Sequence, residues 1–194
     1  MHGKSHGLGR LYHSDGDVYE GMWCMDKAHG YGVYTHYDKS SYSGNWVDDK
    51  QSGWGVEEWP DGARFEGNYA NGLKNGRGKF LWNDNSEYVG NFKDNMMNGE
   101  GMYKWADGRK YEGEWADGKM QGKGVFTWVD GRKYEGDYMD DKKEGYGVFT
   151  WPDGKMYKGQ WKDGKQNGQG AYKGDNGKER SGIWKLGKRE KWIK

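Results

Sequence analysis

The sequence has few of the residues that build ordinary protein cores. Its 194 residues include only eight valines, five leucines, two isoleucines and two prolines. Hydrophobic residues make up 32%, whereas a typical globular domain is about half apolar. This scarcity excludes a conventional core between aliphatic layers, and taken alone it would indicate disorder.

Other absences limit the setting of the protein. The single cysteine, Cys24, excludes an intrachain disulfide framework, and no Asn-x-Ser/Thr sequon occurs. No apolar run is long enough to cross a membrane, and no signal peptide precedes the first glycines. We therefore expect a cytoplasmic protein that is soluble or bound at the periphery of a membrane.

Aromatic residues and glycines are abundant instead. The chain has 12 Trp, 15 Tyr and 36 Gly, and its formal net charge is only +1. A nearly neutral chain that is rich in aromatic side chains can bury enough surface to fold. We therefore expect an aromatic core.

These residues recur with a period of 23, and the third, twelfth and fourteenth residues of every full copy are glycine. The unit, Tyr-x-Gly-x-Trp, then Gly-x-Gly, then Asp-Gly, resembles the MORN repeat. The resemblance predicts a single array over residues 1–194, which begins within a repeat. That beginning leaves open whether a longer array precedes it or a partner supplies a first strand. The array has a half repeat at 1–18, seven full repeats at 19–179, and a C-terminal half repeat and cap at 180–194.

Both halves of the unit alternate with period two, so each is expected to form a strand. The stretch Trp-Pro-Asp-Gly-Lys at 151–155 is typical of a three-residue hairpin loop with Gly154 in the left-handed region. A longer connection from Ala116 to Gln121 is expected inside a repeat. The predicted cross-strand pairs are Phe149–Tyr157, Gly147–Gly159, Tyr111–Phe126 and Trp115–Gly122.

The predicted fold is all-β: an elongated, single-layer, twisted antiparallel meander of about sixteen strands, built from 23-residue hairpin repeats. One face carries a ladder of Tyr and Phe side chains beside a row of glycines, over which the rings can lie. We expect the sheet to curve around this face into a trough. Arg109, Arg132 and Lys155 are expected to make cation–π contacts with tryptophans near the hairpin loops.

A single-layer sheet leaves its aromatic face without a covering layer, and a large exposed aromatic patch usually marks an interaction surface. We therefore expect a protein partner to bind along the trough as a peptide, a helix or a second array. The predicted contacts are Tyr88, Trp105, Tyr111, Trp115, Phe126, Trp128 and Tyr134.

Glu57 interrupts the aromatic ladder between Tyr42 and Phe65. One interpretation is a local repacking in which the additional Trp54 shifts the burial. The other is an anionic notch that accepts a Lys or Arg of the partner. Charged groups on half-exposed strands are common, which favours the first interpretation.

Charge is uneven along the chain. Residues from 155 onward include 12 basic and 4 acidic side chains, whereas residues 1–154 carry a net charge of −7. The basic end either protects the last strand against edge-to-edge aggregation or binds an anionic membrane or an acidic partner. In the second case the contacts are Lys185, Lys188, Arg189 and Lys191.

No catalytic, cofactor or metal site is predicted. The Gly-x-Gly pairs lack the Gly-x-Gly-x-x-Gly spacing and precede strands instead of helices. All five histidines lie in the first 36 residues, mostly at loops and strand ends, so converging metal ligands are not expected. Cys24 has no repeat-linked histidine partner, and Asp48–Asp49 suits a turn.

The resemblance to MORN proteins implies a non-enzymatic scaffold or adaptor in a cytoskeletal, ciliary or membrane-associated assembly. It also implies an alternative, a regulatory module that binds anionic phospholipid, as in lipid kinases. A homodimer of two arrays is a further expected arrangement, and nucleic acid is not an expected partner.

Overall fold

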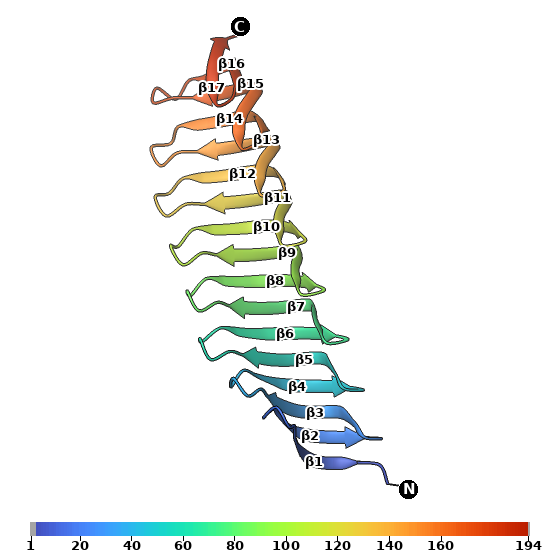
Figure 1. Ribbon diagram of the computed structural model, residues 1–194. Helices are drawn as coiled ribbons and strands as arrows, with labels where there is room; N and C mark the ends of the chain where they lie inside the picture. Colours follow the sequence, from blue (N-terminus) through green and yellow to red (C-terminus); the bar gives the residue numbers. More distant parts are fainter. Residues whose placement is uncertain (1–2, 194) are drawn as a thin grey trace. The chain divides into compact units, whose positions relative to one another are not determined.

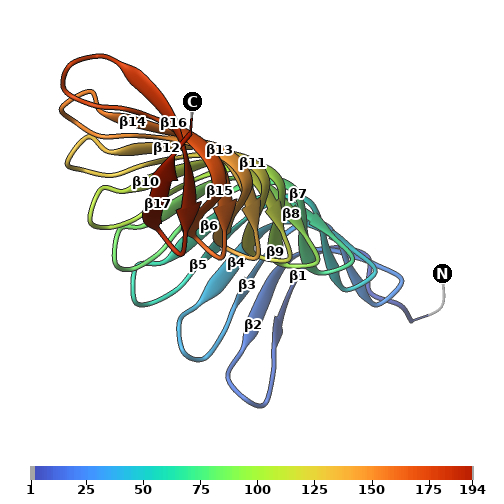
Figure 2. The same ribbon diagram turned by 90° about the horizontal axis from the view of Figure 1, so that it is seen from above.

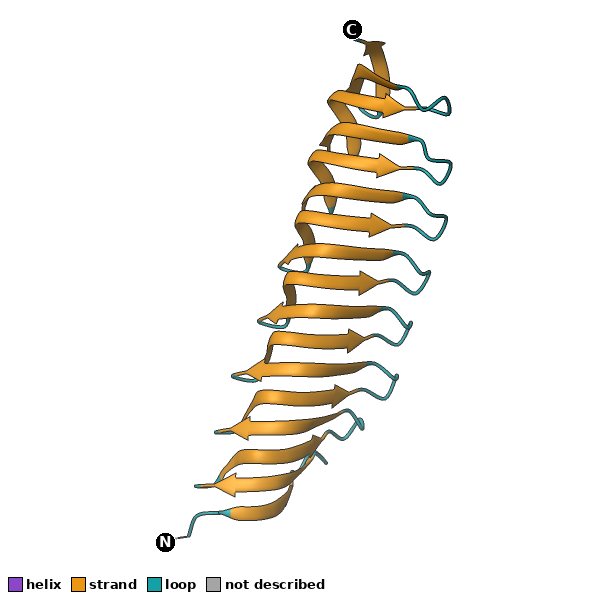
Figure 3. Cartoon of the chain, turned by 180° about the vertical axis from the view of Figure 1, so that it is seen from behind, coloured by secondary structure: helices purple, strands orange, loops and turns teal. Residues whose placement is uncertain are grey.

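The computed structural model describes residues 3–193, which form strands and turns (Figure 3). This range contains no helix, and so none that could cross a membrane. The chain divides into two compact units, residues 1–96 and 97–194. Within each unit, consecutive strands pair antiparallel along one sheet (Figure 1), and successive strands are rotated relative to one another (Figure 2). The predicted all-β meander of hairpin repeats is confirmed.

Unit 1 is an eight-stranded meander. Its strands are β1 (Gly7–Tyr12), β2 (Val18–Cys24), β3 (Lys27–Thr35), β4 (Ser41–Val47), β5 (Lys50–Glu58), β6 (Arg64–Ala70), β7 (Leu73–Leu81) and β8 (Glu87–Lys93).

Unit 2 continues from β9 to β17. The segment expected as a half repeat with a cap at 180–194 forms, over its described residues 180–193, most of a terminal hairpin, so the described residues contain 17 strands instead of about sixteen. The strands are β9 (Met96–Lys104), β10 (Lys110–Ala116), β11 (Lys119–Thr127), β12 (Lys133–Met139), β13 (Lys142–Thr150), β14 (Met156–Lys162), β15 (Lys165–Lys173), β16 (Glu179–Lys185) and β17 (Lys188–Trp192).

The wide loops between repeats have the predicted geometry. The N–H of Trp151 donates to the carbonyl of Lys155 at 2.9 Å, and the N–H of Gly154 donates back to the carbonyl of Trp151 at 3.0 Å. Gly154 has a φ of 83°, which suits glycine. The pairs Phe149–Tyr157 and Gly147–Gly159 are confirmed.

The connection inside each repeat is shorter than predicted. Ala116 pairs with Lys119, so only Asp117 and Gly118 form the turn. Both have positive φ, 48° and 79°, as a two-residue type I′ turn requires. The expected longer connection from Ala116 to Gln121 is therefore wrong.

A β-bulge follows that tight turn. Tyr111 pairs with Phe126 as predicted, but Trp115 pairs with Met120 instead of Gly122. Residues 121–123 of β11 lie opposite the single Glu114 of β10. Gly122, at φ 59°, accommodates the extra residues in the left-handed region.

The tight turns also connect successive hairpins. The N–H of Asp141 donates to the carbonyl of Met120 at 3.1 Å, and its Oδ1 accepts from the N–H of Met120 at 2.8 Å. Where the second turn residue is glycine, as at Gly72, only the backbone bond is formed. The turns with the additional side-chain bond carry Asp26, Asp49, Asn95 and Asp141.

The core lies along one face of each sheet. Tyr111 is fully buried between the edges of Trp115 and Tyr138, with ring centroids 5.1 and 5.2 Å away. A Cβ on Gly124 would lie within 3 Å of the Tyr111 ring, so this ring lies over bare backbone as predicted. The same arrangement recurs at Tyr19, Tyr42, Phe65, Tyr134 and Tyr157.

Candidate functional site

The aromatic face consists of a buried layer and a half-exposed row. Tyr88, Tyr111 and Tyr134 have 0% exposure, and Trp115 and Phe126 have 5% and 8%. The expectation of an uncovered face is therefore corrected, because the aromatic rings shield one another edge to face. These five residues support the surface from beneath and present almost no surface of their own.

The half-exposed part in unit 2 is a line of indoles beside the wide loops. Each indole packs against an aromatic ring of the next repeat. The ring centroids of Trp105 and Phe126 are 5.1 Å apart, and those of Trp128 and Phe149 are 5.5 Å apart. Trp151, which was not among the predicted contacts, occupies the equivalent position in the following repeat. We call Trp105, Trp128 and Trp151 the tryptophan row; all three are partly exposed.

Two of the expected cation–π contacts are present. The guanidinium carbons of Arg109 and Arg132 lie 5.4 Å from the Trp105 and Trp128 rings, respectively. The contact expected of Lys155 is wrong. Its ammonium instead pairs with Asp153 and Asp175 at 2.8 and 2.9 Å, because both carboxylates extend from wide loops next to it.

Glu57 is not an open anionic notch. Its Oε2 pairs with the ammonium of Lys74 at 2.5 Å and accepts from the Tyr69 hydroxyl at 2.9 Å. Burial, and then the charge of Glu57, raise the pKa of Tyr69. Trp54 is 50% exposed, so it does not take over the burial of the missing aromatic ring. Both interpretations offered for Glu57 are therefore corrected: an internal ion pair fills the position.

A lysine without such a partner lies on the aromatic face of unit 2. The ammonium of Lys143 is 5.0–5.2 Å from the centroids of Trp128, Tyr134, Phe149 and Trp161. Burial lowers its pKa, and nearby Arg132 lowers it further. The sequence carried one signal for it, since Lys143 occupies the same repeat position as Lys74.

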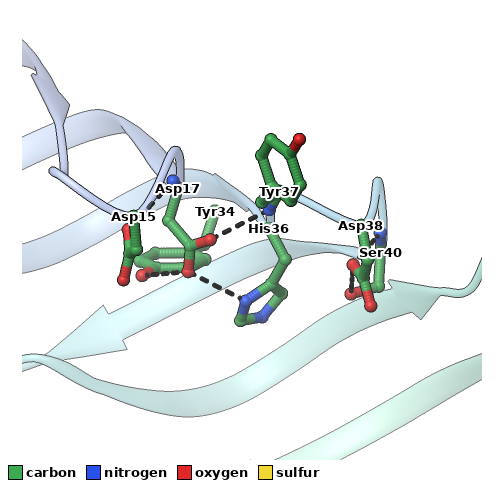
Figure 4. Close-up of polar contacts among 7 residues, drawn as sticks. All are labelled: Asp15, Asp17, Tyr34, His36, Tyr37, Asp38 and Ser40. Carbon is green, nitrogen blue, oxygen red and sulfur yellow. Dashed lines mark hydrogen bonds and ion pairs between the residues drawn. The ribbon is translucent and has the colours of Figure 1, made fainter.

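A polar cluster on the wide loops of unit 1 was not predicted (Figure 4). Asp17 accepts from the Tyr34 hydroxyl at 2.8 Å, from the N–H of Tyr37 at 2.9 Å and pairs with Nδ1 of His36 at 3.0 Å. The Tyr34 bond and then the Tyr37 bond lower the pKa of Asp17. Burial and Asp17 raise the pKa of Tyr34 to about 12. The cluster holds two consecutive wide loops together.

The histidine, cysteine and acidic side chains that could ligate a metal do not come together. Within residues 3–193 no three His, Cys, Asp or Glu side chains are grouped to hold a metal ion, and Cys24 is exposed.

The four predicted basic contacts in the terminal hairpin are exposed but do not share one face; they are Lys185, Lys188, Arg189 and Lys191. The cross-strand pairs Lys185–Lys188 and Ile183–Lys191 place the three lysines on the face opposite Trp184. Arg189 lies on the aromatic side, 4.1 Å from the Trp192 ring.

A family model of the MORN repeat matches residues 1–18, 19–41, 42–64, 65–87, 88–108, 111–131, 134–156 and 157–179. The chain is a MORN repeat protein. The matched stretches of this MORN protein begin at the predicted starts of its seven full repeats. That residues 1–194 form one array stays a prediction, as each of the two compact units is described by itself.

Solved structures share the fold of this MORN chain. The TCP10 domain of Danio rerio CPAP, in complex with a peptide of STIL, has a TM-score of 0.55 at 14% identity. That match covers 97% of this chain and 84% of the CPAP domain. The Drosophila melanogaster SAS-4 TCP domain, in complex with a proline-rich motif of Ana2, has a TM-score of 0.50 at 10% identity, covering 92% and 90%. Among curated proteins none matches the chain.

Proposed function

We propose that this MORN protein is a non-enzymatic scaffold that binds an extended peptide segment of a protein partner across the tryptophan row. The observation that carries the proposal is the line of half-exposed indoles, two of them with an arginine stacked beside them. Trp and Arg are the residues most enriched at binding hot spots. The buried rings beneath hold the indoles in fixed positions, so little conformational entropy is lost on binding.

The repeat spacing supports an extended ligand. Neighbouring strands lie about 4.8 Å apart, so equivalent indoles of successive repeats are about 9.6 Å apart along the sheet. A polyproline II segment advances about 9.3 Å every three residues. A peptide that crosses the strands can therefore place every third side chain on successive members of the tryptophan row.

The structural comparisons support the same class of ligand. Two domains that share this fold were solved with peptides bound, and one of those peptides is a proline-rich motif. Aromatic-lined grooves commonly bind such segments, because their preformed conformation lowers the entropic cost of binding. We propose a cytoskeletal or ciliary setting on the family resemblance.

Selection from a random peptide library on the whole chain tests this proposal. Peptides that bind the wild type are expected to lose about tenfold or more affinity for Trp128→Ala and Trp105→Ala, as hot-spot truncations do. Trp54→Ala is the matched control. Trp54 is exposed on the face of unit 1 opposite its aromatic face, so this variant should bind the selected peptides as the wild type does.

Because half-buried tryptophans also contribute to stability, Trp128→Phe should preserve both the fold and most of the binding. Circular dichroism of each variant separates unfolding from loss of contact. Selected peptides that bind the Trp128→Ala and Trp105→Ala variants as tightly as the wild type would refute the proposal.

Binding to anionic phospholipid is a second candidate function. Lys185, Lys188 and Lys191 are exposed on one face of the β16–β17 hairpin, where they can approach a lipid surface together. Vesicles containing phosphatidylserine should bind the wild type at low salt and release the triple Lys→Gln variant. Equal binding of both proteins, or none at low salt, would reject this candidate.

A further inference from the structure

Two lysines three repeats apart occupy equivalent positions in different electrostatic surroundings. In unit 1, Glu57 serves two groups at once, the ammonium of Lys74 and the hydroxyl of Tyr69. The residues equivalent to Glu57, Tyr69 and Lys74 in unit 2 are Phe126, Tyr138 and Lys143. The lysine and the tyrosine are retained, whereas the acid is replaced by phenylalanine.

The Lys143 ammonium and the Tyr138 hydroxyl of unit 2 therefore lack the carboxylate acceptor that Glu57 provides in unit 1. The hydroxyl of Tyr138 is buried without a hydrogen-bond partner, a rare condition in folded proteins. Among the described residues, no carboxylate lies within 4.0 Å of the Lys143 ammonium. The aromatic rings that surround this lysine stabilise a cation, but they do not neutralise its charge.

A second cation lies near Lys143. Arg132 lies over the same Trp128 ring as Lys143. Asp130 pairs with the Arg132 Nε at 2.7 Å, so this carboxylate already has a cationic partner. Lys143 is partly exposed, and its ammonium lies beside the Trp128 ring, on the same face of the sheet as a ligand bound on the tryptophan row.

We propose that Lys143 binds a carboxylate of the peptide that lies on the tryptophan row. The inference rests on the proposed function and specifies the chemistry of its ligand: an extended segment with an acidic side chain placed beside Trp128. The bound carboxylate forms a charge-assisted hydrogen bond with the ammonium, in surroundings partly shielded from water by the indoles. It takes the role that Glu57 fills internally in unit 1.

Two synthetic peptides of about twelve residues test the proposal, each with proline at every third position, long enough to cross three repeats. One carries glutamates between the prolines, and its twin carries glutamines. Fluorescence anisotropy at low salt should show the wild-type chain binding the glutamate peptide about tenfold more tightly, as expected for one charge-assisted bond. Lys143→Met should abolish this preference.

The chain itself offers the controls. Methionine is the native residue at the equivalent positions 97 and 120, so Lys143→Met fits the fold. Lys142→Met removes an adjacent exposed lysine that pairs with Asp163, and it should keep the preference for glutamate.

A reciprocal exchange sharpens the test. Phe126→Glu copies the arrangement of unit 1, and its internal carboxylate should remove the preference for glutamate. Glu57→Phe copies unit 2, and it should free Lys74 and strengthen binding of the glutamate peptide. Glutamate and glutamine peptides that bind the wild type equally, or no binding of either, would overturn the inference.

The outcomes separate the two proposals. If both peptides bind equally and Trp128→Ala weakens both, the carboxylate inference fails and the peptide scaffold stands. If library selection yields no peptide that depends on the tryptophan row, the scaffold proposal fails as well.

Discussion

At the scale of single residues, the fold depends on aromatic rings that pack over glycines, where a side chain would leave no room for them. Tyr111 lies over Gly124, and its hydroxyl donates to the carbonyl of Glu114 at 3.0 Å. The glycine row of this chain is therefore a packing surface and adds little flexibility. The sequence predicted this relation because ring and glycine recur at fixed spacing.

Gly124→Ala should destabilise the protein by about 3 kcal/mol, the upper end of overpacking, because the added methyl meets the buried Tyr111 ring. Thermal unfolding followed by circular dichroism measures the effect. Gly154→Ala is the comparison: nothing lies within 4 Å of its added Cβ, and its φ of 83° costs only about 1–2 kcal/mol. A melting temperature of the Gly124→Ala protein at or above that of Gly154→Ala would contradict this account.

Asp17 gives a prediction about pH. Its hydrogen bonds lower its folded-state pKa below the usual 3.8, so it stabilises the fold above that pH. This contribution is lost as the pH falls through the lowered folded-state value. Asp17→Asn should therefore melt at a lower temperature than the wild type at about pH 6, and the difference should close by about pH 2. A difference in melting temperature that stayed constant with pH would show that the ionised Asp17 carboxylate does not stabilise the fold.

At the scale of the elements, the tight turns connect one hairpin to the next. The second residue of each turn donates its N–H to the preceding hairpin, and Asp or Asn at that position adds a side-chain bond. These turns stabilise the interface between repeats, which is where a repeat array gains its cooperativity.

Asp141→Ala should lower the free energy of unfolding by about 1 kcal/mol, the net value of the bond from the N–H of Met120 to the Asp141 carboxylate. Gly72→Asn should change it less, because the bond that the new amide oxygen can accept from the N–H of Gln51 is offset by placing a side chain at φ 84°. Urea unfolding of both variants checks the pair. An Asp141→Ala protein as stable as the wild type would show that the side-chain bond is not stabilising.

The β-bulge shows why part of the element structure could not be predicted. A strict period of two placed Trp115 opposite Gly122, since alternation alone carries no sign of extra residues in β11. The bulge follows from the type I′ turn at Asp117–Gly118, whose two positive φ angles are visible only in the structure. The wide loop was predictable because Pro152 and Gly154 each prefer one turn position.

At the scale of the whole molecule, the period predicted the family and the order of the strands, but it did not reveal which aromatic rings are exposed. Tyr88 and Trp128 are both conspicuous in the sequence, and only packing between repeats buries the first and leaves the second partly exposed. Lys143 was missed for a related reason: its significance depends on Phe126 standing in a neighbouring strand where the equivalent residue of unit 1 is the acid Glu57. A comparison of equivalent positions across the repeats would have identified Lys143 from the sequence.

The most direct test of the peptide-binding account is an NMR titration of the tryptophan indole N–H signals with a selected peptide. The account predicts that the signals of Trp105, Trp128 and Trp151 shift on binding, since these indoles form the contact surface. The signal of Trp54, on the opposite face of unit 1, should stay in place. Shifts confined to Trp54, or the absence of any shift in the tryptophan row at saturating peptide, would contradict the account.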